Sequence, residues 1–294
     1  MRRAFRIAAV AMAASLAAMG GARAEPPQSA HGVAQRIMSL DLCTDLLLLE
    51  IAPRARIASV TFLAHDATQS LFPGLDAGIP TNRGSGEDLV RVHPDLVLDS
   101  ELASPFIRSL AGKMGARVVT VKDATSFADI RQVVRQVGQA VREPARAEAL
   151  IQRMDAELAT LATEPAPRTA RGPLKVVAWS GGSAVPGQGT LTNSIIAAAG
   201  ATNIAARPGA STSSFGVEEL LAERPDLLLY GGAALSKPSL LSDQAEHRAV
   251  RELYAGRRIA YADAAYTCGL PQSADAARDL RRAMTAAMTR EPRR

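Results

Sequence analysis

Apolar residues recur every three or four positions between Pro144 and Ala162, which is the spacing of one face of an α-helix. This apolar stripe consists of Ala147, Leu150, Ile151, Met154, Leu158 and Leu161. Pro144 suits the first position of a helix, where a backbone N–H has no partner to lose. The following segment, 163–173, contains three prolines and cannot continue the helix. We therefore predict one uninterrupted helix of about 28 Å, at a rise of about 1.5 Å per residue.

Short apolar runs alternate with amphipathic segments on both sides of this helix. Such alternation is typical of α/β proteins, in which helices cover parallel sheets. The predicted strands are residues 36–40, 57–62, 94–99 and 117–122 before the helix, and 174–179, 225–230 and 258–261 after it. Two stretches rich in glycine, 72–86 and 180–189, are predicted to be loops.

One sequence pattern occurs in both halves of the chain. Residues 86–98 align without a gap on residues 217–229, and each copy runs from an acidic residue through a short amphipathic helix to Pro-Asp and a buried strand. Glu87 precedes Pro94 by seven positions, and Glu218 precedes Pro225 by the same number. We therefore predict an α/β fold of two similar lobes with parallel sheets, joined by one long helix. The expected boundaries are 34–142 for the N-terminal lobe, 143–163 for the connecting helix and 173–289 for the C-terminal lobe.

The first 24 residues have the features of a secretory signal peptide. Arg2, Arg3 and Arg6 precede an apolar run, and Ala22-Arg23-Ala24 forms a small-x-small cleavage site. We expect export and cleavage after Ala24. No cysteine lies near that site, so a lipid anchor is not expected.

Charge and motif content narrow the function classes. Four of the 34 basic residues lie in the predicted signal, which leaves 30 basic against 29 acidic residues and gives no reason to expect nucleic acid or an anionic membrane as a partner. The chain has no H-E-x-x-H, G-x-S-x-G or P-loop motif, and its four histidines show no metal-ligand spacing. We therefore expect no catalytic residues, no resident metal and no cofactor.

The order of these features resembles class III periplasmic substrate-binding proteins of ABC importers. The resemblance rests on the export signal, the opening Arg36–Leu40 strand, the Glu-(six residues)-Pro-Asp unit in each half and the connecting helix, and it covers roughly residues 34–288. Members of this family deliver ferric siderophores, haem or cobalamin to an inner-membrane permease. The resemblance thus implies a monomeric, periplasmic receptor for a metal chelate, with a two-fold symmetric ABC permease as its partner.

In doubly wound sheets, ligands bind beyond the carboxyl ends of the strands, and two such lobes would enclose one cleft. Aromatic residues are only 4% of the chain, yet several fall at these ends, where rigid rings suit a bulky ligand. The alternative is that the same rings belong to the core. The candidate ligand-binding residues are Leu42, Cys43, Phe62, His65, Arg83, Trp179, Ser180, Phe215, Tyr230, Tyr266 and Cys268.

Glu87 and Glu218 occupy equivalent positions of the repeated unit. The family resemblance implies that one exposed glutamate on each lobe pairs with arginines of the permease, and a two-fold partner requires equivalent positions. The alternative is a structural role, because acidic residues are favoured in the first turn of a helix.

The two cysteines, Cys43 and Cys268, are predicted at cleft-side loops of opposite lobes. In the periplasm, a pair of cysteines is usually oxidised to a disulfide. A second possibility is two thiolates that reach a metal or haem iron together with His65. A third is two unrelated free thiols.

Two rival functions remain open. The first is an exported enzyme or metal chaperone on the same fold, with Cys43, Cys268 and His65 as its reactive groups. The second is an interaction protein without a small ligand. Arg83 is the main cation expected in the cleft, which favours cobalamin, haem or a near-neutral hydroxamate over a highly anionic chelate.

Overall fold

The computed structural model describes residues 32–182, 184–231 and 239–289. The predicted signal peptide, residues 1–24, lies outside the described residues. The chain from Val33 onward belongs to one structural unit. Of the helices that are described, none is long and apolar enough to cross a membrane.

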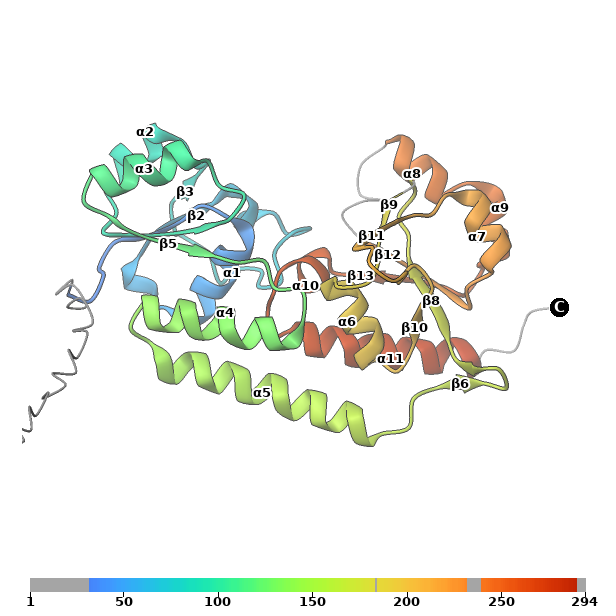
Figure 1. The fold of residues 1–294 in the computed structure, drawn as a ribbon. Helices are drawn as coiled ribbons and strands as arrows, with labels where there is room; N and C mark the ends of the chain where they lie inside the picture. The colour runs from blue at the N-terminus through green and yellow to red at the C-terminus, as the bar shows by residue number, and fades with distance from the viewer. Residues whose placement is uncertain (1–31, 183, 232–238, 290–294) are drawn as a thin grey trace, which may run out of the picture. The chain divides into compact units, whose positions relative to one another are not determined.

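The N-terminal lobe contains a five-stranded parallel sheet in the order β3-β2-β1-β4-β5 (Figure 1). Its strands are β1 (Ile37–Ser39), β2 (Ile57–Thr61), β3 (Thr81–Asn82), β4 (Leu96–Ser100) and β5 (Arg117–Val121). The helices are α1 (Leu42–Ile51) and α4 (Phe127–Ala140), which share one core cluster, and α2 (Gly86–Val92) and α3 (Pro105–Lys113), which share another. Because helices cover both faces, the central strands β1 and β4 are buried along their whole length.

The C-terminal lobe contains a four-stranded parallel sheet in the order β10-β8-β12-β13 (Figure 1). Its strands are β8 (Lys175–Ala178), β10 (Thr202–Asn203), β12 (Leu227–Gly231) and β13 (Arg258–Tyr261). The helices of one face are α6 (Leu191–Ala198), α10 (Asp263–Thr267) and α11 (Ser273–Thr289), and those of the other are α7 (Val217–Glu223), α8 (Leu240–Ala245) and α9 (Arg248–Leu253).

The predicted long helix is α5 (Pro144–Thr163). Its apolar stripe is buried at Ala147, Leu150, Ile151, Met154 and Leu161, in a core cluster that also contains residues of both sheets. Its polar side is tied to α4 by the Arg131–Asp155 ion pair and to α11 by the Arg278–Glu157 ion pair. The two parallel sheets and the connecting helix confirm the predicted fold class.

The repeated unit has the same backbone structure in both lobes. Helix α2 ends at His93 and α7 ends at Arg224, each in the left-handed conformation (φ 48° and 44°), and a proline follows each. The aspartate of each Pro-Asp pair then accepts a hydrogen bond from the neighbouring strand. Asp95 accepts from the backbone N–H of Gln35 at 2.7 Å, and Asp226 accepts from that of Lys175 at 2.7 Å. The shared spacing therefore fixes where each helix stops and where each pair of strands begins.

Both segments predicted to be loops also contain short strands. Strand β3 extends the first sheet, and β9 (Ala184–Pro186) pairs antiparallel with β11 (Thr212–Ser214). Strands of two or three residues are too short to show a hydrophobic period. The other short elements are η1 (Arg54–Arg56), η2 (Phe62–His65), β6 (Arg168–Thr169) and β7 (Gly172–Pro173).

Candidate functional site

Phe62 and Arg83 lie at the carboxyl ends of the neighbouring parallel strands β2 and β3. The guanidinium carbon of Arg83 lies 5.0 Å from the centroid of the Phe62 ring, within the range of a cation–π interaction. The Phe62 side chain is 46% exposed, and Arg83 is also exposed. This edge of the N-terminal lobe therefore presents a flat apolar ring and a positive charge to solvent.

His65 lies at the end of η2, which continues directly from β2. Its Nδ1 atom lies 3.1 Å from Oδ2 of Asp76, a buried carboxylate, while the imidazole itself is 37% exposed. An ionised carboxylate can only accept a hydrogen bond, so Nδ1 carries the proton and Nε2 keeps its lone pair. A carboxylate held against one ring nitrogen in this way is the usual device that orients a metal-binding histidine. Sequence analysis missed Asp76, because nothing in the spacing links it to His65.

Trp179 and Phe215 are not part of an exposed cleft, and their prediction as ligand-binding residues is corrected. They are 2% and 0% exposed, and they pack in one core cluster with Val185. The indole N–H of Trp179 donates to the carbonyl oxygens of Gly182, at 2.9 Å, and Phe215, at 3.0 Å. The physical reason is the β9–β11 pair, which contributes Val185 and covers the end of β8.

The other predicted residues of the C-terminal lobe differ in exposure. Tyr266 is 4% exposed and stacks on Tyr261 with ring centroids 4.1 Å apart, so most of its ring is used in packing. Tyr230 is half-buried, and the guanidinium carbon of Arg258 lies 5.0 Å from its ring centroid. The hydroxyl of Ser180 accepts from the backbone N–H of Gly231 at 3.0 Å and so joins the ends of β8 and β12.

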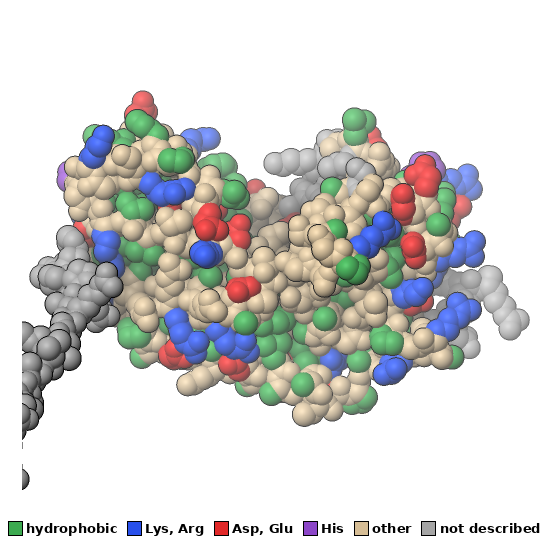
Figure 2. All heavy atoms as spheres, in the orientation of Figure 1, with side chains coloured by type: hydrophobic (Ala, Val, Ile, Leu, Met, Phe, Trp, Pro, Cys, Tyr) green, Lys and Arg blue, Asp and Glu red, His purple; other side chains and the backbone are tan. Residues whose placement is uncertain are grey.

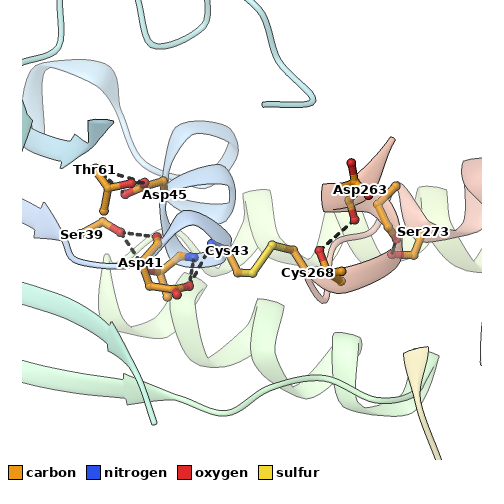
Figure 3. Close-up of a disulfide and its surroundings, with 11 residues drawn as sticks. Ser39, Asp41, Cys43, Asp45, Thr61, Asp263, Cys268 and Ser273 are labelled. Carbon is orange, nitrogen blue, oxygen red and sulfur yellow. Dashed lines mark hydrogen bonds between the residues drawn. A yellow bond between two sulfur atoms is a disulfide. The ribbon is translucent and has the colours of Figure 1, made fainter. Parts of the chain in front are cut away.

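Cys43 and Cys268 form a disulfide with an S–S distance of 2.02 Å and a Cα–Cα distance of 5.0 Å (Figure 3). Cys43 is in the first turn of α1, where its N–H donates to the N-cap carboxylate of Asp41 at 2.9 Å, and Leu42 beside it is half-buried. Cys268 follows α10 in the other lobe. The bond uses both sulfurs, so neither the thiolate pair with His65 nor two free thiols describes this chain. Within the described ranges, no three His, Cys, Asp or Glu side chains are grouped to hold a metal.

Further contacts join the lobes beside the disulfide. The side-chain amide of Gln272 donates to Oε1 of Glu50 at 2.7 Å, and burial raises the pKa of Glu50 to about 6. The hydroxyl of Ser194 donates to the carbonyl of Thr125 at 3.0 Å. A side chain at Gly269 would place its Cβ 2.3 Å from that of Ala124, so only glycine allows this close approach.

A buried acid supports the end of strand β2. Asp45 of α1 is fully buried and accepts hydrogen bonds from the backbone N–H and the hydroxyl of Thr61 (Figure 3). Burial raises the pKa of Asp45 to about 7, although the hydrogen bonds from Thr61 oppose that rise. Because Thr61 directly precedes Phe62, this contact fixes the point from which the exposed residues of η2 project.

The surface is hollowed between the two lobes on the upper side of Figure 2. A pocket of about 360 Å³ lies between the loop after η2 and β13, α10 and α11, a volume within the range of small-molecule sites. Its apolar lining includes Phe72, Tyr261 and Tyr266. Tyr261 ends a predicted strand, so the strand-end rule should have selected it. A second, enclosed cavity of about 20 Å³ beside Cys43 has room for a water molecule and not for a ligand.

Glu87 and Glu218 are both exposed and both occupy the second position of their helices, α2 and α7. The acid that follows each of them is used locally instead. Asp88 accepts from the N–H groups of Arg83 and Ser85, which lowers the pKa of its carboxyl to about 2. Glu219 accepts from the N–H of Gly216 at 2.8 Å.

Comparison with known proteins places this geometry in a family. A family model described as periplasmic binding protein matches residues 74–261. No curated protein sequence matches the chain. The fold is similar to that of the periplasmic haem-binding protein RhuT from Roseiflexus sp. RS-1 in its apo form, with 25% identity, a TM-score of 0.66, and coverage of 86% of this chain and 99% of that one.

Two structures from Vibrio cholerae share the fold at lower identity. The periplasmic haem-binding protein HutB is 19% identical with a TM-score of 0.67, and the match covers 84% of this chain and 98% of that one. The periplasmic vitamin B12-binding protein BtuF is 17% identical with a TM-score of 0.61, and the match covers 88% and 99%. Since the family model spans more than half of the sequence, the chain belongs to the periplasmic binding protein family.

Proposed function

We propose that this chain captures a metal chelate in the periplasm and delivers it to an ABC permease, and that haem is the chelate that its geometry favours. The family is periplasmic, and its members and structural neighbours are binding proteins. The proposed working units are lobes of residues 34–142 and 173–289 on either side of the helix 143–163, acting as a monomer.

The observation that carries the proposal is the exposed group at the ends of β2 and β3. His65 presents an unprotonated Nε2 because Asp76 holds Nδ1, and Phe62 and Arg83 are exposed at the same sheet edge. Haem iron leaves axial positions open for a protein ligand, whereas a hexadentate siderophore fills all positions of its iron. A flat macrocycle with carboxylate substituents also suits an exposed ring beside an arginine.

The disulfide argues against the rival enzyme or metal chaperone. That function needs thiols at Cys43 and Cys268, and both sulfurs are bonded to each other. Delivery to the permease is proposed to use Glu87 and Glu218, whose exposure and equivalent helix positions meet the requirement of a two-fold partner. Tyr230, half-buried at the end of β12, is the remaining C-terminal candidate for ligand contact.

The test is a titration of the purified protein with ferric haem, followed by the absorbance of the haem. We expect saturation at one equivalent for the unmodified protein and loss of the axial-ligand spectrum in His65→Ala. His247→Asn is the matched control, because His247 is an exposed histidine that caps α9 and asparagine keeps that cap. Thermal shifts with haem, cyanocobalamin and a ferric hydroxamate would be recorded in parallel.

A shift with cyanocobalamin or the hydroxamate alone would contradict haem and retain the chelate receptor. No shift with any of the three would contradict the proposed function. An unchanged haem spectrum in His65→Ala would exclude His65 as the axial ligand.

A further inference from the structure

Helices α2 and α7 each pair an exposed glutamate with an exposed apolar residue. Val90 follows Glu87 by three positions and is 64% exposed, and Leu221 follows Glu218 by three positions and is 45% exposed. Residues three apart lie next to each other on one helix face. Both lobes therefore display the same acidic and apolar pair, which we call the Glu–Val pair on α2 and the Glu–Leu pair on α7 (Figure 1 shows the two helices).

The local structure of neither helix requires these side chains. The first turn of α2 is satisfied by the carboxylate of Asp88, and that of α7 by Glu219. Leu89 and Leu220, which point inward, are both fully buried and supply the core contact of their helices. Within the part of the chain that the structure describes, neither Glu87 nor Glu218 forms an ion pair.

A glutamate alone is a weak docking group. An ion pair that stays in contact with water contributes about 0–1 kcal/mol, because solvent screens the charges. Interface residues contribute more where neighbouring apolar contacts exclude water from them. An apolar side chain one turn along the same helix face is in the right place to do this.

We infer that Val90 and Leu221 are docking residues that cover the Glu87 and Glu218 ion pairs against a two-fold symmetric permease, each of whose halves offers a cationic side chain flanked by apolar surface. Single exposed apolar residues are common on protein surfaces, but here one occurs at the same position of both copies of a repeated unit. A partner with two equivalent faces needs such a match. The inference rests on the proposed delivery to a permease.

The experiment measures the affinity of the haem-loaded protein for the haem-importing permease of the source cells, purified in nanodiscs. We expect Val90→Gln and Leu221→Gln each to weaken docking about fivefold, and the double variant about 25-fold, since the two sites are independent. Haem affinity should stay unchanged. Met288→Gln is the matched control, because Met288 is 44% exposed on α11 and belongs to neither pair.

Docking by the double variant that equals that of Met288→Gln, with docking still lost in Glu87→Ala/Glu218→Ala, would overturn this inference and leave the proposed function standing. If the glutamate variants also dock normally, or the unmodified protein does not bind the permease, the delivery function itself fails. Weakened haem binding in Val90→Gln or Leu221→Gln would assign these residues to the ligand site and also overturn the inference.

Discussion

The ends of the strands differ between the two lobes, although both sheets are parallel and carry the same repeated unit. In the N-terminal lobe, Phe62 and His65 come after β2 and remain exposed. In the C-terminal lobe, Trp179 comes after β8 and is 2% exposed. The difference comes from the next segment of chain in each lobe: a short 3₁₀ helix after β2, and a hairpin-like β9–β11 pair after β8.

This contrast shows that topology selects the region of a site and not its residues. A strand end faces the cleft by topology, but a few residues of antiparallel pairing can bury the side chain that stands there. The N-terminal lobe thus carries the exposed binding groups, and the C-terminal lobe uses its largest ring for stability.

The largest expected effect separates these two roles directly. Trp179→Ala removes a fully packed ring with both indole hydrogen bonds, and we expect a loss of about 3–5 kcal/mol in the free energy of unfolding. Phe62→Ala, at a half-exposed position, should change that free energy by less than about 1 kcal/mol and weaken haem binding instead. Urea unfolding and haem titration of both variants measure this, and equal stability losses would contradict the assignment.

The disulfide is where the two lobes meet, and its removal comes next. Cys43 and Cys268 are 225 residues apart in sequence, so the bond removes much entropy from the unfolded chain. We expect Cys43→Ser/Cys268→Ser to lose about 2–5 kcal/mol of stability, or reductant to produce the same loss in the unmodified protein. Urea unfolding with and without reductant measures it.

The double variant also supplies its own control. Reductant should have no effect on it, because within the described residues the chain has no other disulfide. A stability equal to that of the unmodified protein would show that Glu50–Gln272 and the other contacts between the lobes suffice to hold them.

The sequence predicted most of the fold because its signals are local. Long amphipathic stretches such as 144–162, and the Pro-Asp units of the repeat, fix their own structure. The burial of Trp179 could not be predicted, because β9 and β11 are three residues each and pair across about 25 residues of intervening chain.

Pairing across the chain also limits what sequence says about the site. Cys43 and Cys268 could be placed at facing loops, yet their bond depends on the lobe arrangement and not on spacing. The orientation of His65 by Asp76 is likewise a tertiary contact. In contrast, Glu87 and Glu218 were found through the repeat itself, which explains why their equivalent positions could be predicted.

A smaller effect tests the support of the exposed site. Burial raises the pKa of Asp45 from 3.8 to about 7. Between about pH 4 and 7 the unfolded carboxyl loses its proton while the folded one keeps it, so this group makes stability fall as pH rises through that window. Asp45→Asn removes the titration and can still accept from Thr61. We expect the stability of the unmodified protein relative to this variant to fall by about 2–3 kcal/mol from pH 4 to pH 7.

Asp88 provides the control with the opposite sign. Its hydrogen bonds lower its pKa to about 2, so it contributes stability above the pKa of the unfolded chain and loses it only as pH falls below about 4. Asp88→Asn should therefore leave the slope between pH 4 and 7 unchanged. A flat difference between the unmodified protein and Asp45→Asn across that window would show that the buried acid does not titrate there.

The smallest expected effect compares the two arginines that lie over aromatic rings. Arg83 over Phe62 and Arg258 over Tyr230 have the same 5.0 Å separation, but Arg258 also pairs with Glu246 at 2.6 Å. Because the charge of Arg83 is free to meet a carboxylate of the ligand, Arg83→Gln should weaken haem binding about tenfold and cost less than about 1 kcal/mol of stability. Arg258→Gln should leave haem affinity unchanged, because its charge is already neutralised within the lobe. Equal losses of haem affinity in the two variants would mean that both lobes contribute charge to the ligand, and the contrast between an exposed binding edge and a packed one would no longer hold.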